Sequence, residues 1–191
     1  MTGRSTPGTA HTKLLILCAI VLALVIASVG SAAESLPLAS NSPASARVPK
    51  WADGFNVPGV VGPVNALAAD HYGHLYAGGS FAVAGRAVAS NVAMWDGSKW
   101  SALGSGMNRD VFALAIDHGG NSNLYAGGYF TTAGGVSLNK VAMWDGSSWS
   151  ALGSGIEGSV FALAVDSAGN LYAGGDIQSA GGVEVANIAK W

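Results

Sequence analysis

Three copies of one sequence pattern fill most of this 191-residue chain, and this repetition limits the possible folds more than any other feature. The segment Leu-Tyr-Ala-Gly-Gly occurs at residues 75–79, 124–128 and 171–175. Each is preceded by an Ala-Leu-Ala-x-Asp segment, and the copies are spaced by 49 and then 47 residues. A repeat of this length forms one supersecondary unit per copy, and neighbouring units stack to bury a continuous core.

Each period of the repeat contains four short candidate strands, for example residues 111–117, 124–130, 141–144 and 149–152. The first alternates small and large apolar side chains, so both of its faces are expected to be buried. Asp145-Gly146 predicts a tight two-residue hairpin, because glycine accepts a positive φ. Four antiparallel strands per copy are typical of a β-propeller blade. A β-helix needs a much shorter period, and a sandwich does not repeat in sequence.

We therefore expect an all-β fold, a β-propeller-like array of about three four-stranded antiparallel blades, with copies at about 51–95, 96–144 and 145–191. Propellers typically close with four to eight blades, so three copies predict an incomplete propeller. Residues 51–57, at the start of the first copy, precede its first inner strand in the place where a fourth strand should lie, and they are expected to complete the last blade. Three arrangements stay open: a fragment of a longer array, two chains joined as a six-bladed ring, or an open stack.

Residues 1–33 have the pattern of a signal peptide. Two basic residues precede a nearly unbroken apolar run at 14–29, and small residues then favour cleavage before Glu34. The alternative is an uncleaved N-terminal membrane anchor, although sixteen helical residues span only about 24 Å of a hydrocarbon core of roughly 30 Å. We expect a secreted or cell-surface protein, in which residues 34–50 form a flexible linker.

The composition argues against several partners and chemistries. Charged residues make up only 10% of the chain, the net charge is −2, and there is no basic run. Nucleic acid and anionic membrane surfaces are therefore unexpected partners. The single cysteine, Cys18, lies inside the N-terminal apolar run. The mature part consequently has no disulfide, thiol nucleophile or thiolate metal site.

The repeat also resembles known families. The double glycine that ends the second strand, followed by an aromatic residue and later by a fourth-strand tryptophan, resembles the kelch motif. The string GNLYAGGDIQSAGGVEVANIAKW at 169–191 resembles the delta-60 repeat of bacterial exported proteins, and also the repeats of Rax2-like fungal cortical marker proteins. The resemblance covers residues 51–191 and implies a propeller fold and export. It implies little about activity, because propellers host many unrelated functions. Arg86 departs from the pattern, since the other copies have Gly135 and Gly182 there.

The recurrent polar residues are expected to serve the turns. Five aspartates are interpreted as turn residues rather than calcium ligands: Asp70, Asp96, Asp117, Asp145 and Asp166. His71 and His74 have the spacing of metal ligands, but the third copy has serine and asparagine there, which indicates surface histidines. No metal site, no cofactor and no triplet of nucleophile, base and orienting group is predicted.

Four tryptophans are weighed between sugar platforms and packing between blades: Trp95, Trp100, Trp144 and Trp149. Their recurrence in successive copies favours packing. We therefore expect no enzyme, but an exported non-catalytic repeat scaffold for binding or adhesion at the cell surface or outside the cell. The alternatives are a carbohydrate-binding, lectin-like propeller, or a propeller that is accessory to a catalytic domain missing from this fragment. The expected partner is a protein or a glycan, with self-association to complete a propeller ring.

The variable loops indicate where a ligand would bind. Consecutive antiparallel strands reverse direction, so the turns after the first and third strands share one face of the array. The loops after the second and fourth strands share the other face, and these differ most between copies. Variable loops on a fixed scaffold are where recognition usually occurs. The predicted ligand face is built around Arg86, Arg109, Tyr129 and Glu157.

Overall fold

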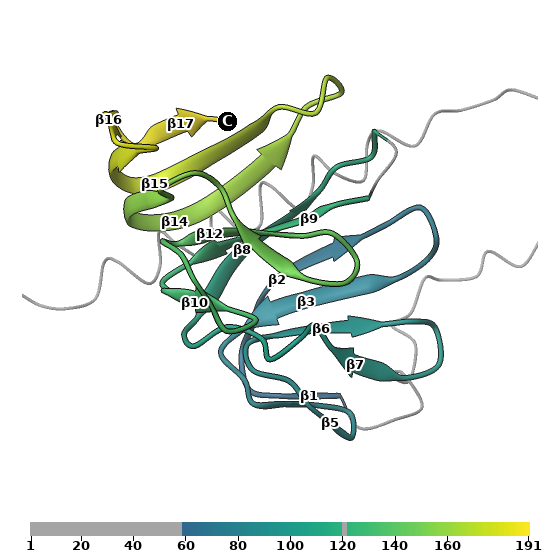
Figure 1. Cartoon of the computed structure of the whole chain (residues 1–191). Coiled ribbons are helices and arrows are strands. Elements are labelled where there is room, and N and C mark those ends of the chain that lie inside the picture. The colour runs from purple at the N-terminus through teal and green to yellow at the C-terminus, as the bar shows by residue number, and fades with distance from the viewer. Residues whose placement is uncertain (1–58, 120–121) are drawn as a thin grey trace, which may run out of the picture. The chain divides into compact units, whose positions relative to one another are not determined.

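The computed structural model describes residues 59–119 and 122–191, which form strands and connecting turns without any helix (Figure 1). None of these residues therefore belongs to a helix that could cross a membrane. The predicted signal peptide, the linker at 34–50 and the expected strand at 51–57 lie outside the described residues.

Three antiparallel sheets follow one another along the chain, and we call them blades 1, 2 and 3. Blade 1 has the order β2-β3-β6-β7, with β2 (Val64–Ala69), β3 (Leu75–Gly79), β6 (Val92–Trp95) and β7 (Trp100–Ala102). Blade 2 has the order β8-β9-β12-β13, with β8 (Val111–Ile116), β9 (Leu124–Gly128), β12 (Val141–Trp144) and β13 (Trp149–Ala151). Blade 3 contains β14 (Ile156–Val165), β15 (Leu171–Ala180) and β17 (Ile188–Lys190).

The predicted architecture is confirmed: the chain is an all-β, propeller-like array of antiparallel blades that is incomplete. Blades 1 and 2 have four strands in simple meander order. In blade 3, β15 pairs with β14 on one side and with β17 on the other, and no described strand follows β17. The sheets begin at their inner strands, so the copy boundaries at 96 and 145 fall inside sheets, one strand before each sheet ends.

Each blade also carries a short hairpin that was not predicted from the sequence. These hairpins form within the loop after the second strand and consist of β4 (Val83–Ala84) with β5 (Ala87–Val88), and β10 (Thr132–Ala133) with β11 (Val136–Ser137). In blade 3, β16 (Val183–Glu184) pairs with the end of β15, and in blade 1 β1 (Val60–Val61) pairs with β4. Two paired residues per strand leave no periodic pattern that a sequence prediction detects.

Glycine allows neighbouring blades to approach closely. The inner strand β8 packs against both β2 and β14. A Cβ atom on Gly78 of β3 would lie 2.6 Å from Val111 Cγ1 of β8, and one on Gly127 of β9 would lie 2.5 Å from Val160 Cγ1 of β14. The recurrent double glycine therefore gives the blade interface a close contact that any side chain would prevent.

Burial follows from this stacking. In β8 every residue except Phe112 is buried, as predicted for a strand covered on both faces. The inner leucine is 8% exposed in blade 2 and 4% exposed in blade 3, but its counterpart Leu67 in blade 1 is 46% exposed. The face of β2 that carries Leu67 therefore remains open in the part of the chain that the structure describes.

The β12–β13 hairpin is centred one residue later than predicted. The backbone N–H of Asp145 donates to the carbonyl of Ser148 at 3.2 Å, so Gly146 and Ser147 form the tip rather than Asp145-Gly146. Asp145 Oδ1 accepts hydrogen bonds from the N–H groups of Ser147 and Ser148. The carboxylate thus closes the turn from its base, which moves the centre of the turn by one position.

Candidate functional site

The blades present two faces with different chemistry. The turn face carries the connections β2–β3, β6–β7 and their counterparts in the other blades. The loop face carries the longer connections, residues 80–91 and 103–110 and their counterparts.

The aspartates of the turn face are held inside their own turns. Asp70 Oδ1 accepts hydrogen bonds from the N–H groups of Tyr72 and His74, both at 2.9 Å, and Oδ2 contacts His74 Nδ1 at 2.7 Å. Asp166 Oδ1 likewise accepts from two backbone N–H groups of its turn, and its Oδ2 accepts from the Asn170 side chain and the Tyr172 hydroxyl. The prediction of side-chain-closed turns is therefore confirmed.

These contacts also determine how the groups titrate. Burial alone would raise the pKa of Asp70, but hydrogen bonds from His74 and Tyr72 outweigh it, so the pKa lies below its ordinary value. The Asn170 side chain and backbone lower the pKa of Asp166 to about 2. Burial and then the neighbouring Asp70 carboxylate raise the pKa of Tyr76 to about 12. All three groups hold a fixed protonation state near neutral pH, which suits a structural role.

The two histidines with metal-like spacing have separate partners. His74 pairs with Asp70, whereas His71 Nδ1 lies 3.2 Å from the hydroxyl of Ser122 in blade 2. Within the described residues, no group of three or more His, Cys, Asp or Glu side chains is arranged to hold a metal ion.

Buried tryptophans join the blades. Trp149 is 4% exposed, and its Nε1 donates at 2.9 Å to the carbonyl of Leu103, which lies beyond the end of β7 in blade 1. Trp144 is half-buried, and its ring centroid lies 5.3 Å from that of Trp149. Trp100 is also buried and stands beside Trp95 at 5.7 Å. The buried member of each pair, Trp100 or Trp149, serves packing and is too covered to be a sugar platform.

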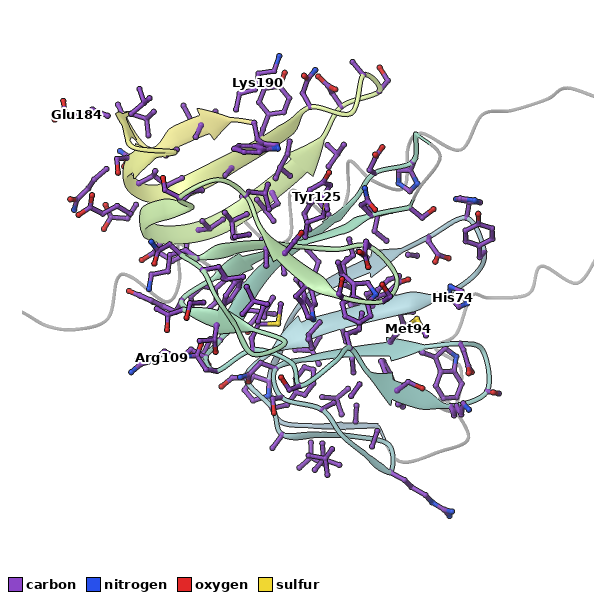
Figure 2. The ribbon with its side chains drawn as sticks, viewed as in Figure 1. His74, Met94, Arg109, Tyr125, Glu184 and Lys190 are labelled. Atoms are coloured by element: carbon purple, nitrogen blue, oxygen red, sulfur yellow. The ribbon has the colours of Figure 1, made fainter. Side chains whose placement is uncertain are left out.

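The structure brings two of the four predicted ligand-face residues together. Arg109 and Tyr129 are both exposed, and the N–H of Tyr129 donates to the carbonyl of Asp110, next to Arg109, at 2.9 Å. Figure 2 shows Arg109 extending outward from this region. Arg86 and Glu157 are exposed on other segments, and no hydrogen bond, ion pair or ring contact joins either of them to Arg109 or Tyr129 in the described part of the chain.

Arg86 changes the turn of its hairpin. In blade 2 both tip residues, Gly134 and Gly135, have positive φ, at 58° and 84°. In blade 1 only Gly85 has a positive φ, at 60°, and Arg86 is not among the residues with positive φ. The arginine therefore converts a hairpin with the φ signs of a type I′ turn into one with those of a type II′ turn, because a side chain disfavours positive φ at the second position.

An aromatic row beside Tyr129 was not predicted from the sequence. The ring centroid of Phe112 lies 5.5 Å from that of Tyr129, edge to face, and 5.8 Å from that of Phe161. Both phenylalanines are half-buried on inner strands. They occupy one position of the repeat, at which blade 1 has Asn65, and this difference between copies was the available signal.

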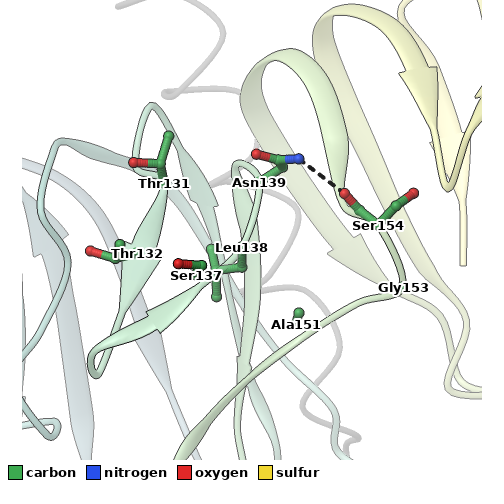
Figure 3. A pocket seen from close by; sticks show the side chains of 8 residues that line it. All are labelled: Thr131, Thr132, Ser137, Leu138, Asn139, Ala151, Gly153 and Ser154. Carbon is green, nitrogen blue, oxygen red and sulfur yellow. Dashed lines mark hydrogen bonds between the residues drawn. The ribbon is translucent and has the colours of Figure 1, made fainter.

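A shallow groove lies on the loop face of blade 2, where it begins two residues after Tyr129 (Figure 3). Its volume is about 470 Å³, and it is lined by Thr131, Thr132, Ser137, Leu138, Asn139, Ala151, Gly153 and Ser154. Hydroxyl and amide groups dominate this lining, and none of the eight residues is charged. The groove thus offers neutral donors and acceptors, the chemistry that orients a polar ligand in a pocket.

Two asparagines hold the walls of the groove. Asn108 Oδ1 accepts from the N–H groups of Thr131 and Thr132, and its Nδ2 donates to Thr131 Oγ1 at 2.9 Å. On the other side, Asn139 Nδ2 donates to the carbonyl of Ser154 at 3.1 Å, as Figure 3 shows. These contacts link the β10–β11 hairpin to the loops before and after blade 2, so the groove depends on three segments that are distant in sequence.

No protein-family model matches this chain, and no curated protein matches its sequence. The geometry of the described residues is therefore the basis for assigning a function. It comprises a turn face whose carboxylates serve folding and a loop face with a neutral groove, an aromatic row and an exposed arginine.

Proposed function

We propose that this chain is an exported, non-catalytic repeat scaffold that binds a partner at the cell surface or outside the cell, through the loop face of its blades. The observation that supports this most is the groove of blade 2, lined by Thr131, Ser137 and Asn139 among others. It lies on the face whose loops vary between copies, next to Tyr129 and Arg109. Variable loops on a repeated scaffold are the usual place of recognition.

The proposed export rests on residues 1–33, which have the charge and apolar pattern of a signal peptide. The resemblance of the repeat to delta-60 repeats of exported proteins supports the same location. A scaffold of this kind needs no disulfide, because close glycine contacts and buried tryptophans hold the blades together.

The proposed absence of catalysis is supported by the state of the titratable groups. The carboxylates of Asp70 and Asp166 accept hydrogen bonds within their own turns, and their pKa values lie below the ordinary range. A general acid or base works best when its pKa lies near the operating pH. The groove, in addition, has no ionisable side chain in its lining.

A carbohydrate ligand is the second candidate, and the neutral lining of the groove favours it. Hydroxyl and amide groups such as Thr132 and Asn139 donate to and accept from sugar hydroxyls without desolvating a charge. The exposed ring of Tyr129, two residues before the groove begins, supplies an amphipathic surface beside it. A partner protein would instead use the wider loop face, including Arg86 and Glu157.

The test is a binding screen of the purified full chain against a glycan array and against extracellular surface proteins. For the ligand found, Ser137→Ala combined with Asn139→Ala is expected to weaken binding about tenfold, because two neutral hydrogen bonds are lost. Arg109→Ala and Tyr129→Ala are expected to weaken it as well. Glu184→Ala is the matched control, because Glu184 occupies in blade 3 the position of Ser137.

One result would refute this assignment of faces. If Asp96→Ala and Asp145→Ala abolish binding without lowering the melting temperature, while the groove variants bind normally, then the ligand occupies the turn face.

We also propose that the chain self-associates through the open face of blade 1. Leu67 and Val64 are exposed on β2, at positions where blades 2 and 3 bury Leu114 and Val111 or Leu163 and Val160. At the other end of the array, Gly174 corresponds to Gly78 and Gly127, and a Cβ atom there would have no neighbour closer than 3.9 Å. The two open faces are the two halves of the interface that the blades form internally, so the contact would be heterologous.

A further inference from the structure

Three loop-face residues of blade 2 have no equivalent in the other blades. They are Arg109, Tyr129 and Lys140, and each occupies a position of the repeat at which blades 1 and 3 carry no cationic or aromatic side chain. The counterparts in blades 1 and 3 are, in the same order, Gly62 and Gly158, Ser80 and Asp176, and Asn91 and Asn187. Two cations and an exposed tyrosine are therefore concentrated in the middle blade, which packs against a described blade on each side.

Hydrogen bonds bring these three residues to one place. The N–H of Tyr129 donates to the carbonyl of Asp110, next to Arg109, at 2.9 Å. The N–H of Lys140 donates to the carbonyl of Phe130 at 3.1 Å, and the Lys140 ammonium donates to the carbonyl of Tyr129 at 3.2 Å. The loop before β8, the residue after β9 and the residue before β12 therefore meet at Tyr129.

The backbone of blade 2 differs from that of the other blades where it carries Arg109. The counterparts Gly62 and Gly158 have φ values of 130° and 118°, a region that side chains rarely adopt. A Cβ atom on either glycine would collide with a backbone carbonyl oxygen. Arg109 is not among the residues with positive φ, and its side chain extends outward in Figure 2. Blade 2 thus has a backbone conformation at this position that admits a long cationic side chain.

Lys140 occupies a position that asparagine fills better. Its φ is 61°, in the left-handed region, which a lysine adopts at a cost. In the other blades the asparagine Oδ1 at this position accepts a backbone hydrogen bond, from Phe81 N–H in blade 1 and from Ile177 N–H in blade 3. A lysine side chain has no acceptor and cannot make this bond. Strained residues cluster at binding sites, so the cost of Lys140 indicates a function for its ammonium group.

Both cations have hydrogen-bond donors to spare. The Lys140 ammonium has three N–H donors, and its bond to the Tyr129 carbonyl uses one of them. The Arg109 guanidinium has five, and within the described residues no hydrogen bond or ion pair engages this side chain. Tyr129 is 45% exposed, and its ring packs edge to face against Phe112. A fixed, exposed ring beside two cations suits a ligand that has both an apolar face and an anionic group.

We propose that Arg109, Tyr129 and Lys140 form a binding site for the carboxylate or sulfate group of an acidic saccharide, and we call these three residues the anion site. This inference rests on the proposed function and names the class of ligand that the loop face binds. Two residues that line the neutral groove, Thr131 and Asn139, lie within two positions of Tyr129 and Lys140 along the chain. The anion site would hold the charge, and the hydroxyl and amide groups of the groove would hold the uncharged part of the saccharide.

The charges of the chain favour an external ligand at the anion site. The segment that precedes the described residues, 1–58, contains four basic and two acidic residues: Arg4, Lys13, Arg47 and Lys50, and Glu34 and Asp53. It therefore has no excess of negative charge to attract it to two cations.

The probe is a glycan array that displays sialylated, uronic-acid and sulfated oligosaccharides, each beside its neutral counterpart, and the purified full chain is applied to it. We expect the acidic member of at least one pair to bind about tenfold or more tightly than the neutral member, because charge-assisted contacts are added. The carboxylated and sulfated pairs distinguish the two sources of the anion. Binding should weaken as the salt concentration rises, since the site is exposed.

The variant Lys140→Asn separates binding from folding. It removes a cation but introduces the asparagine of the other blades, so it should weaken binding of the acidic saccharide about tenfold without lowering the melting temperature. Arg109→Gln should also weaken binding, whereas Asp110→Asn should strengthen it, because it removes a negative charge next to Arg109. Lys99→Asn is the matched control, since it removes an exposed lysine from the turn face of blade 1.

Four outcomes would overturn the anion site. Acidic and neutral members of every pair bind equally, or no glycan on the array binds. Lys99→Asn weakens binding as much as Lys140→Asn does, which would indicate non-specific attraction. An aspartate-rich peptide binds more tightly than any acidic saccharide, which would make an acidic protein the ligand.

Failure of the anion site differs from failure of the proposed function. A neutral saccharide or a protein that Lys140→Asn binds normally, but that Ser137→Ala combined with Asn139→Ala binds weakly, overturns only the anion site. The proposed function fails when the ligand is lost from turn-face variants and kept by the variants of both the groove and the anion site.

Discussion

At the scale of single residues, three equivalent positions adopt an unusual backbone conformation. Asn91, Lys140 and Asn187 each have a φ of about 61–66°, in the left-handed region, at the end of the loop that precedes the third strand. Asparagine tolerates this region better than lysine does. Asn91 Oδ1 also accepts a hydrogen bond from Phe81 N–H, and Asn187 Oδ1 accepts one from Ile177 N–H. Blade 2 thus uses the least suitable residue of the three.

The variant Lys140→Asn is expected to raise the free energy of unfolding by about 1 kcal/mol, because it relieves left-handed strain and provides the same bond to Phe130 N–H. Urea denaturation measures this change. The reciprocal variant Asn187→Lys should lower the free energy of unfolding by a similar amount. A Lys140→Asn chain that unfolds more easily than the wild type would show that the bond from Lys140 Nζ to the Tyr129 carbonyl outweighs the strain.

The turn aspartates predict how stability depends on pH. The folded-state pKa values of Asp70 and Asp166 lie below their ordinary values. A lowered folded pKa contributes stability that is fully present above the unfolded pKa and is lost as the pH falls through the folded pKa. For Asp166, whose folded-state pKa is about 2, the loss should occur as the pH falls from the ordinary aspartate pKa of 3.8 to that folded-state value.

Melting temperatures measured from about pH 6 down to about pH 2 should therefore fall steeply at the acid end. This interval covers the unfolded-state pKa of Asp166 and reaches its folded-state pKa. In the Asp166→Asn chain the fall should be shallower, because the amide oxygen accepts the same backbone hydrogen bonds without titrating. Parallel curves for the two chains would show that Asp166 is not among the groups responsible.

At the scale of secondary-structure elements, the second strand of each blade determines how closely the next blade can approach. Gly78 and Gly127 lie against valines of the following inner strand. Gly174 is their counterpart in β15, and no described blade follows it. The chain therefore contains a covered and an open version of the same glycine.

This difference gives a prediction with an internal control. Gly127→Ala should lower the free energy of unfolding by about 1–3 kcal/mol, because the new methyl group forces Val160 out of its rotamer. Gly174→Ala should change it little, since its nearest neighbour, Ala162 Cβ, lies at 3.9 Å. Denaturant titration of both variants measures the comparison. Equal losses would mean that the penalty comes from the strand backbone and not from the blade interface.

The periodic parts of the structure could be predicted from the sequence, and the packed parts could not. Strands such as β8 and β12 follow from their apolar pattern, and the turn at Asp166 follows from the chemistry of aspartate. The groove depends on the bonds from Asn108 to Thr131 and Thr132, which join segments from successive blades. The packing of Trp149 between blades 1 and 2 depends on a hydrogen bond to a carbonyl 46 residues away. Sequence periodicity predicts which residues share a strand, but not which loops meet once the blades stack.

At the scale of the whole molecule, the part of the array that the structure describes has two unlike ends. The first end exposes side chains of β2, and the second exposes Gly174 and the edge of β17. Unlike ends that fit one another generate a ring or an open filament, depending on the rotation between copies.

Self-association is therefore expected to depend on the exposed side chains of β2, at the first end of the array. Sedimentation velocity of the wild-type chain should show a sedimentation coefficient that rises with protein concentration. Leu67→Asp should reduce this association, because it places a charge where an apolar contact would form. Val88→Asp adds the same charge at a different exposed apolar residue and should leave association unchanged. A wild-type chain that stays monomeric across the concentration range would contradict the proposed contact.

The offset between the repeated sequence and the sheets has a consequence for how such arrays change length. Each copy ends one strand before its sheet does, so β7 and β13 are encoded at the start of the next copy. With copy boundaries at 96 and 145, a duplicated or deleted copy joins its neighbours within a sheet, where hydrogen bonds to both sides re-form. Recombination between copies in this phase alters the number of blades while every internal blade keeps its full set of strands. The gene can thus lengthen or shorten the array in whole blades, and only the two end surfaces carry the result.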